Sequence, residues 1–391
     1  MTKRVIRFGV IGCGLMGREF ASAVGRWRHL LDLDFEPQIT AACNRGEGPL
    51  DWFRGCVPEL SLATREYRRL LESPDVEAVY IAVPHNQHEE IYRAAIQAGK
   101  HILGEKPFGI DLAANRAILA ELARHPELLV RCSSEFPFFP GAYRIAQWMH
   151  EGRFGRIIDV EAGFWHSSDL DPNKPLNWKR QTRTCGAYGC MGDLGLHVAH
   201  LPFRAGWYPG NVRAFLSKIF TQRPDKNGQM ALCDTWDNAL LACEAASEGW
   251  TFPLQLSMKR IAPGHANTWF LRINGTLGAA EFSTQNPKQL RFLWYSPDAK
   301  TGEGQAWRTL DMPYQSAYPT ITGPIFEFGF GDAILQMWAA FCDELVHGRE
   351  GMRQLFFCAT PEETTLSHQL FSAALESNRE SSVVSLNSVD G

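Results

Sequence analysis

Asp193 and His197 stand four residues apart in the stretch CGAYGCMGDLGLHVAHL, residues 185–201. At the start of a helix, this spacing puts two side chains on one face. Histidine is a natural general base near neutral pH, and aspartate can orient it or bind a substrate hydroxyl group. Alternatively, Asp193 only caps the helix and His197 packs in the core. A metal held with His200 is disfavoured because no further ligand motif accompanies the two histidines, so we expect no metal.

Lys106 is a second candidate for handling a proton. It lies in HILGEKPFG, residues 101–109, at the end of a short apolar run. A single lysine beside a turn is most often a surface cation. Near other positive groups, however, its pKa would fall toward a value useful in proton transfer. Pro107 restricts the backbone of Lys106 to an extended conformation and so aims its side chain.

Three glycines near the N-terminus predict a dinucleotide-binding loop. Gly12, Gly14 and Gly17 form the pattern G-x-G-x-x-G, which here follows a strand and opens a helix. In this pattern Gly12 permits the tight turn, Gly14 lets the backbone approach a pyrophosphate, and Gly17 lets the helix pack closely. The helix N-terminus then faces the negative charges. The remaining residues expected in this cofactor loop are Cys13, Leu15 and Met16.

The end of the second predicted strand bears on the choice between NAD and NADP. Asp32 and Asp34 precede that strand, and its end carries Asn44 followed by Arg45. Asn44 lacks the charge that would repel a 2′-phosphate, and Arg45 could pair with one. Arg45 could instead stack on the adenine. The cofactor is therefore predicted to be NADP or NAD, with NADP favoured.

Further cofactor contacts are expected where the third and fourth predicted strands end. The stretch AVPHNQH, residues 82–88, ends the third strand, at the edge where α/β sheets bind ligands. The alternative is that His88 only caps the next helix or packs at its start. The contacts expected at this edge are Val83, Pro84, His88, Glu105 and Lys106.

The pattern of elements predicts an α/β protein with two domains. The N-terminal part alternates strands and helices, which is typical of a doubly wound parallel sheet. The later part has consecutive strands without helices between them, which favours an antiparallel sheet. We place the boundary so that residues 1–135 and 136–391 form the domains. The predicted strands of the first part are 7–12, 38–43, 76–83, 101–105 and 128–136, and the predicted helices of the chain are 18–31, 64–73, 88–99, 111–126, 142–152, 332–348 and 361–380.

Composition narrows the class of protein. The 391 residues are 45% hydrophobic and 21% charged, which suits two globular domains. The net charge of −4 and the lack of a basic run argue against a nucleic-acid partner. Ten cysteines without a C-x-x-C pattern favour reduced thiols in a cytoplasmic protein. No apolar run reaches the roughly 18 to 20 residues of a membrane span, so no membrane partner is expected.

The order GCGLMG, VPHNQH, AIQAGKHILGEKP and GDLGLH resembles the Gfo/Idh/MocA oxidoreductases, the family of glucose–fructose oxidoreductase and inositol dehydrogenase. The resemblance implies a Rossmann domain followed by an α/β domain with a large open, mostly antiparallel sheet that often builds a homodimer or homotetramer. It implies hydride transfer between a nicotinamide and a carbinol carbon of a sugar, sugar derivative or polyol. Lys106, Asp193 and His197 would be the catalytic residues, with His197 or Lys106 as proton acceptor.

The chain also departs from the family pattern. SSEFPFFP, residues 133–140, carries Glu135 where many members have a basic or aromatic residue, which disfavours an acidic substrate at that point. The late segment PIFEFGFGD, residues 324–332, is most like the sugar dehydrogenase branch. Two alternatives stay open: a non-catalytic NADP-binding sensor and an NAD-dependent glycosidase of the same family. Candidate substrate contacts, besides the three catalytic residues, are Trp165, His166, Trp178, Lys179 and Arg180.

Overall fold

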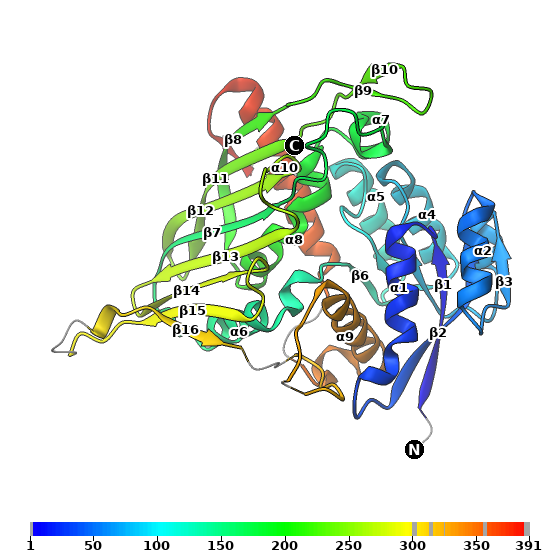
Figure 1. The fold of residues 1–391 in the computed structure, drawn as a ribbon, viewed down its shortest axis with the longest axis horizontal. Helices are drawn as coiled ribbons and strands as arrows, with labels where there is room; N and C mark the ends of the chain where they lie inside the picture. Colours follow the sequence, from blue (N-terminus) through cyan, green and yellow to red (C-terminus); the bar gives the residue numbers. More distant parts are fainter. Residues whose placement is uncertain (1–2, 299–302, 313–315, 324, 355–357, 387–391) are drawn as a thin grey trace. The chain divides into compact units, whose positions relative to one another are not determined.

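The chain forms two compact units (Figure 1). The computed structural model describes residues 3–298, 303–312, 316–323, 325–354 and 358–386, so Pro324 of PIFEFGFGD lies outside it. The first unit is Met1–Phe138 with Gln315–Thr364, and the second is Phe139–Tyr314 with Thr365–Gly391. The functional boundary expected near residue 135 stays a proposal. The compact units add a late segment of the chain to the first unit.

The first unit is built on a parallel sheet. Within its described residues, six strands lie in the order β3-β2-β1-β4-β5-β6. This strand order is that of a Rossmann fold and confirms the predicted class of the first domain. All four side chains of β4 are buried, as expected for a strand covered on both faces. The strands are β1 (Arg4–Ile11), β2 (Phe35–Cys43), β3 (Leu62–Thr64), β4 (Ala78–Ile81), β5 (His101–Gly104) and β6 (Val130–Cys132).

The elements of the first unit differ from the prediction most between β2 and β4, and α1 spans Leu15–Gly25 where a helix over 18–31 was predicted. The segment between β2 and β4 contains α2 and β3, neither of which was predicted from the sequence. Lys106 therefore follows the fifth strand in chain order, not the fourth, although the strand itself is the one predicted. The helices are α1 (Leu15–Gly25), α2 (Glu47–Cys56), α3 (Tyr67–Leu71), α4 (His88–Gln97), α5 (Leu112–Leu122) and α9 (Phe330–Gly351), with 3-10 turns at Trp27–His29, His85–Gln87 and Phe136–Phe138.

Helix α9 joins the first unit although it lies late in the sequence. Its Trp338 stacks on Phe20 of α1 with ring centroids 3.7 Å apart. The same ring meets Phe8 of β1 edge-on at 5.3 Å and Tyr80 of β4 at 5.1 Å. Such aromatic clusters combine large buried area with favourable ring geometry. This buried aromatic cluster explains why α9 belongs to the compact unit that contains the Rossmann sheet.

The second unit is built on a larger sheet. In its described part, nine strands lie in the order β16-β15-β14-β13-β7-β12-β11-β8-β17. Among the strand pairs of this described part only β12 and β7 are parallel, so the predicted, mostly antiparallel character of the sheet is confirmed. Along β11 every second side chain is buried, which leaves the alternate side chains on a solvent-facing side. The strands are β7 (Ile157–Trp165), β8 (Tyr208–Ser217), β11 (Asn238–Ser247), β12 (Trp250–Lys259), β13 (Thr268–Gly275), β14 (Gly278–Ser283), β15 (Gln289–Trp294), β16 (Arg308–Asp311) and β17 (Val384–Ser385), beside the small pair β9 (Gln222–Pro224) and β10 (Met230–Leu232).

Helix α8 (Cys190–Arg204) is the central helix of the second unit, and its residues from Cys190 to Phe203 are buried. It packs on β12 and β7 (Figure 1). A Cβ on Gly195 would lie 2.2 Å from Cζ of Phe371, so glycine is required where α8 meets α10. The other helices are α6 (Pro140–His150), α7 (Thr182–Cys185) and α10 (Pro361–Glu380), with 3-10 turns at Trp178–Arg180 and Glu303–Gln305. No helix of the described ranges is long and apolar enough to cross a membrane.

Candidate active site

The glycine loop of the first unit has the shape expected for a dinucleotide. Gly12 has a φ of +103°, and a Cβ there would lie 2.2 Å from the carbonyl oxygen of Ala82. A Cβ on Gly17 would lie 2.2 Å from the carbonyl oxygen of Gly12. A Cβ on Gly14, which caps α1, would meet only open space. Two glycines are therefore needed for folding, and Gly14 leaves room for a ligand beside the helix N-terminus.

Asn44 ties this loop to the end of β2. Its Oδ1 accepts a hydrogen bond from the backbone N–H of Cys13 at 3.3 Å, and its Nδ2 donates to the carbonyl of Gly46 at 2.9 Å. Burial, reinforced by Cys43, raises the pKa of the Cys13 thiol to about 12, so Cys13 is a neutral packing residue. Leu15 is exposed and Met16 is half-buried on the first turn of α1.

Arg45 is exposed directly after Asn44. A second arginine, Arg65, donates from Nε to the carbonyl of Arg45 at 2.9 Å. Two guanidinium groups thus belong to the loops that follow β2 and β3. Sequence reasoning missed Arg65 because β3, which brings it there, has only three residues.

His88 links two loops of the sheet edge. Its ring is buried, its Nε2 lies 3.0 Å from the carbonyl of Val83, and the backbone N–H of Gly109 donates to its Nδ1 at 3.4 Å. Because a backbone N–H can only donate, Nδ1 is the acceptor and Nε2 carries the proton. His88 therefore holds the loop after Lys106 against the loop after β4. Both ring nitrogens of His88 bind protein groups. The neighbouring residues Val83 and Pro84 are half-buried.

Lys106 is half-buried and joined to Pro107 by a cis peptide bond. The neighbouring Glu105 is buried, and its Oε1 accepts hydrogen bonds from the hydroxyls of Tyr80 and Ser133, each at 2.7 Å. Burial, together with Glu105, raises the pKa of Glu135 to about 7, against the opposing effect of Lys106. A cluster of ionisable groups therefore surrounds Lys106 on the Rossmann unit.

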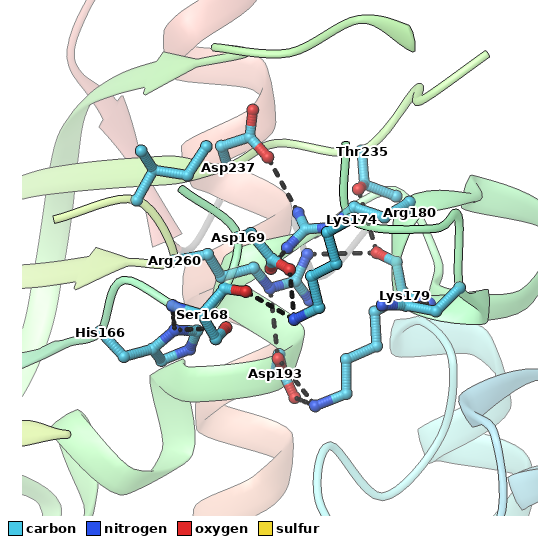
Figure 2. Close-up of polar contacts among 12 residues, drawn as sticks. His166, Ser168, Asp169, Lys174, Lys179, Arg180, Asp193, Thr235, Asp237 and Arg260 are labelled. Carbon is cyan, nitrogen blue, oxygen red and sulfur yellow. Dashed lines mark hydrogen bonds and ion pairs between the residues drawn. The ribbon is translucent and has the colours of Figure 1, made fainter. Parts of the chain in front are cut away.

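Asp193 is the centre of the second group (Figure 2). Its carboxylate is 2% exposed, and Nζ of Lys179 lies 2.9 Å from Oδ1 and 3.1 Å from Oδ2. Nε of Arg260 donates to Oδ2 at 3.2 Å. Arg260 is fully buried; burial disfavours its charge, but Asp193 and two cysteines outweigh burial and raise its pKa. Asp193 is thus held between two cations.

His197 lies one turn after Asp193 on α8, as the spacing predicts. Its ring meets Phe164 of β7 edge-on, with centroids 5.7 Å apart, and its carbonyl accepts from the indole of Trp269 at 2.8 Å. The helix and the two neighbouring strands therefore fix the position of this buried imidazole within the second unit.

His166 belongs to the same group as Asp193. Burial, with contributions from Arg260, Lys179 and Arg180, lowers its pKa to about 4, although Asp193 opposes the shift. The backbone N–H of Ser168 donates to Nδ1 at 3.4 Å, and the Ser168 hydroxyl lies 2.8 Å from the same atom (Figure 2). The ring is therefore neutral at pH 7 and carries its proton on Nε2.

The side chains of two predicted substrate contacts, Trp165 and Arg180, bind other protein groups. Trp165 lies on the face of β7 opposite Phe164: its indole donates to Ser257 at 2.8 Å, and Lys259 lies over its ring at 4.2 Å. Arg180 is buried, pairs with Asp169 and donates to Asp237 at 2.8 Å. Burial, then Arg260, lowers the pKa of Arg180 to about 10. These contacts favour structural roles for both side chains.

Trp178 and Lys179 lie in the 3-10 turn before α7, with Nζ of Lys179 5.7 Å from the centre of the Trp178 ring. Arg260 braces this turn by donating to the carbonyl of Lys179 at 3.1 Å, and Thr235 donates to the same carbonyl at 3.0 Å (Figure 2). Sequence reasoning missed Arg260, since a single cation between two strands carries no motif. Among the residues that the structure describes, no group of three or more His, Cys, Asp or Glu side chains could hold a metal ion.

Comparison with known proteins shows the class of enzyme to which the chain belongs. Residues 6–131 match the model of an oxidoreductase family with an NAD-binding Rossmann fold. The glycine loop described above is what that class requires, because it leaves room for a dinucleotide where the helix begins. The chain is therefore an oxidoreductase of the NAD-binding Rossmann class.

A relative that is 30% identical over more than two thirds of its length identifies the family. The dTDP-3,4-didehydro-2,6-dideoxy-alpha-D-glucose 3-reductase of Actinomadura kijaniata is 30% identical over 280 residues, 70% of this chain and 73% of the relative. The levoglucosan dehydrogenase of Pseudarthrobacter phenanthrenivorans is 25% identical over 282 residues, 69% of this chain and 68% of the relative. The protein belongs to the Gfo/Idh/MocA family of oxidoreductases.

Solved structures share the fold over almost the whole chain. A levoglucosan dehydrogenase in complex with NADH and levoglucosan matches with a TM-score of 0.85 at 22% identity, covering 98% of this chain and 100% of that one. An inositol dehydrogenase homologue from Azotobacter vinelandii, in complex with NAD+, matches with a TM-score of 0.78 at 19% identity, covering 98% and 99%. Both units therefore have the architecture of the family.

Proposed function

We propose that this protein is a dehydrogenase that transfers a hydride between a nicotinamide cofactor and a carbinol carbon of a sugar, sugar derivative or polyol. The observation that carries the proposal is the buried Asp193 carboxylate, gripped by Lys179 and Arg260 one turn before His197. Such an array of a cation, a carboxylate and an imidazole suits a ligand with adjacent hydroxyl groups. The names of the two relatives, one a dehydrogenase and one a sugar reductase, support this reaction class.

The chain's own residues would divide the work with the cofactor. A bound nicotinamide would supply the hydride acceptor at its C4 during oxidation. His197 would take the hydroxyl proton while Lys106 holds the substrate oxygen, or Lys106 would take the proton itself. Asp193 would accept a hydrogen bond from a neighbouring hydroxyl beside the ammonium of Lys179 and the guanidinium of Arg260, since each carboxylate oxygen can accept more than one hydrogen bond.

The remaining substrate contacts are proposed from the same group. Lys179 would donate to a hydroxyl beside Asp193, and the face of Trp178 would cover an apolar side of the ring. His166 would donate from Nε2, since its Nδ1 accepts from Ser168. Trp165 and Arg180 are less suitable because protein contacts engage both side chains.

For the cofactor we propose NADP ahead of NAD. Arg45 and Arg65 together would offer two guanidinium groups to a 2′-phosphate, and Asn44 brings no negative charge to the end of β2. The alternative is NAD, with Arg45 stacking on the adenine ring. NADH is the cofactor named for the solved levoglucosan dehydrogenase complex.

One assay tests the proposal. The purified protein is mixed with NAD or NADP and a panel of sugars and polyols, and the nicotinamide absorbance is followed. Net cofactor reduction that Asp193→Asn abolishes is the expected result. Cofactor binding without turnover on any substrate would favour a non-catalytic sensor. Cleavage of an aryl glycoside without net redox change would favour the glycosidase alternative.

A further inference from the structure

A buried pair of glutamates accompanies Lys106 in the first unit. Glu105 follows β5 and Glu135 lies three residues after β6, and these two strands are parallel neighbours with Gly104 opposite Cys132. The carboxyl ends of parallel neighbours meet at one edge of the sheet, so the two acids belong to the same edge. Glu105 is 7% exposed and Glu135 is 4% exposed.

The two carboxyl groups differ in their surroundings. Glu105 accepts hydrogen bonds from Tyr80 and Ser133 on one oxygen, which fixes its orientation. Burial and the charge of Glu105 raise the pKa of Glu135 to about 7, and the charge of Lys106 opposes this rise. Two buried acids side by side favour one shared negative charge over two. Glu135 is thus the member of the pair that changes its charge near neutral pH.

Three acids of α9 have partners of their own, and the fourth, Glu350, is exposed. Of the acids on α9, Asp332 pairs with Arg26, Glu344 pairs with Arg131, and Asp343 binds Tyr318 and His347. Tyr80 and Tyr92 are buried with pKa values raised by burial, so both stay neutral hydroxyls. The ionisable groups that face the pair are Tyr80 on β4, Tyr92 on α4, Lys106 after β5 and Cys132 on β6, with Cys358 beyond Cys132.

We infer that Glu135 is a positioning residue that controls the charge of Lys106 and thereby the pH range in which the enzyme oxidises its substrate. As a carboxylate, Glu135 favours the ammonium form of Lys106, which can hold a substrate oxygen but cannot take a proton. As a neutral acid, it favours the amine form. The inference rests on the proposed role of Lys106 as the proton acceptor, and it gives a use to the residue that departs from the family pattern.

The direct test follows the Glu135 carboxyl group in the protein without cofactor. Difference infrared spectroscopy between pH 6 and 8 detects the C=O stretch of protonated carboxyl groups, and acids with ordinary pKa values near 4 are silent there. We expect a band that titrates near pH 7 and is absent from Glu135→Gln. In Lys106→Met the titration should move up by about one pH unit or more, because a nearby cation has been lost. Lys100→Met, at the other end of β5, is the matched control and should leave the titration in place.

The second arm measures kcat/KM against pH for the oxidation. In Glu135→Gln the acid limb should move to lower pH, since Lys106 loses the carboxylate that favours its ammonium form, whereas exposed Glu127→Gln should change nothing. A merely structural Glu135 would change the height of the profile and not its position. A wild-type protein without a titrating band, or with a band that ignores Lys106→Met, overturns the inference even if dehydrogenase activity is present. A protein without dehydrogenase activity refutes the proposed function, while the infrared arm still decides the coupling.

Discussion

At the scale of single residues, the surroundings of Asp193 limit its chemistry. Its two oxygens meet the ammonium of Lys179 and the guanidinium of Arg260, both within 3.2 Å. Hydrogen bonds from cations favour the ionised form of a carboxylate, so such a group is a weak proton acceptor. In the proposed reaction Asp193 therefore binds and orients, and the proton must go to His197 or Lys106.

Replacing Lys106 tests this assignment of roles to Asp193, His197 and Lys106. Lys106→Ala should lower kcat by about 10²- to 10⁴-fold, the usual contribution of one general acid or base. The dissociation constant for the cofactor should change by less than threefold, because the glycine loop holds the dinucleotide. Lys100→Ala is the control for removing a lysine from the same unit. Steady-state kinetics and fluorescence titration measure the two quantities, and a fully active Lys106→Ala enzyme would contradict the mechanism.

Arg45 and Arg65 allow the cofactor preference to be tested at two positions. Arg45→Ala should weaken NADP by about 10- to 100-fold, since a hydrogen bond to a charged group contributes roughly 1.5–3 kcal/mol. Its effect on NAD should be small. Arg65→Ala should act in the same direction, and the exposed Arg124→Ala should affect neither cofactor. Equal losses for NAD and NADP would show that Arg45 does not bind the phosphate.

At the scale of elements, the glycines in the turn from β1 to α1 have different roles, some in folding and one in binding. A Cβ at Gly17 or Gly12 would collide with main-chain atoms, whereas a Cβ at Gly14 would meet nothing within 4 Å. Gly14→Ala should therefore leave the melting temperature within about 2 °C of wild type, as expected for a surface change, yet weaken dinucleotide binding at least tenfold. Gly25→Ala, in the same helix with equally open surroundings, should leave both unchanged. Calorimetry and cofactor titration give the two readouts; unchanged affinity in Gly14→Ala would place the pyrophosphate elsewhere.

Elements with a strong local pattern could be predicted, and weakly patterned ones could not. The strand ending at Ile81 is continuously apolar, and the glycine loop sits between a strand and a helix, so both follow from sequence. β3 has three residues, and α2 contains Gly48 and Pro49 in its first turn, which hides its helical pattern. The place of α9 depends on Trp338 meeting three aromatic residues far away in the chain, which periodicity does not encode.

The same limit applies to the candidate site. The spacing of Asp193 and His197 is local to one helix, so a motif could reveal it. Arg260 lies alone after β12, and its burial against Asp193 arises only when the sheet and α8 pack together. Trp165 ends β7 and His166 follows it directly, yet Trp165 packs against Ser257 and Lys259 whereas His166 joins the group around Asp193. Sequence could name the aromatic and basic residues, but not the face of the sheet that each one joins.

At the scale of the whole molecule, the solvent-facing side of the large sheet carries charged pairs on some strands and a pair of large apolar side chains on others. Neighbouring strands carry alternating charges, with Arg272 2.7 Å from Glu161 and Arg291 3.0 Å from Glu281. These pairs are exposed and contribute little to stability one by one. Near the other end of the sheet, Phe215 of β8 lies opposite Leu240 of β11 in the strand register, and they are 54% and 36% exposed. Large apolar side chains paired across exposed strands favour an interface over open solvent.

We therefore expect a homodimer or homotetramer that buries this side of the sheet. A double change, Phe215→Glu with Leu240→Glu, should shift the protein toward monomers, because the few hot-spot residues near the centre of an interface contribute about 2 kcal/mol or more each. Ile325→Glu, an equally drastic change at a 78% exposed position of the first unit, is the control and should leave the mass unchanged. Light scattering coupled to size-exclusion chromatography at micromolar concentrations gives the mass. A monomeric wild-type protein, or an oligomer that survives the double change, would show that this side of the sheet serves another purpose.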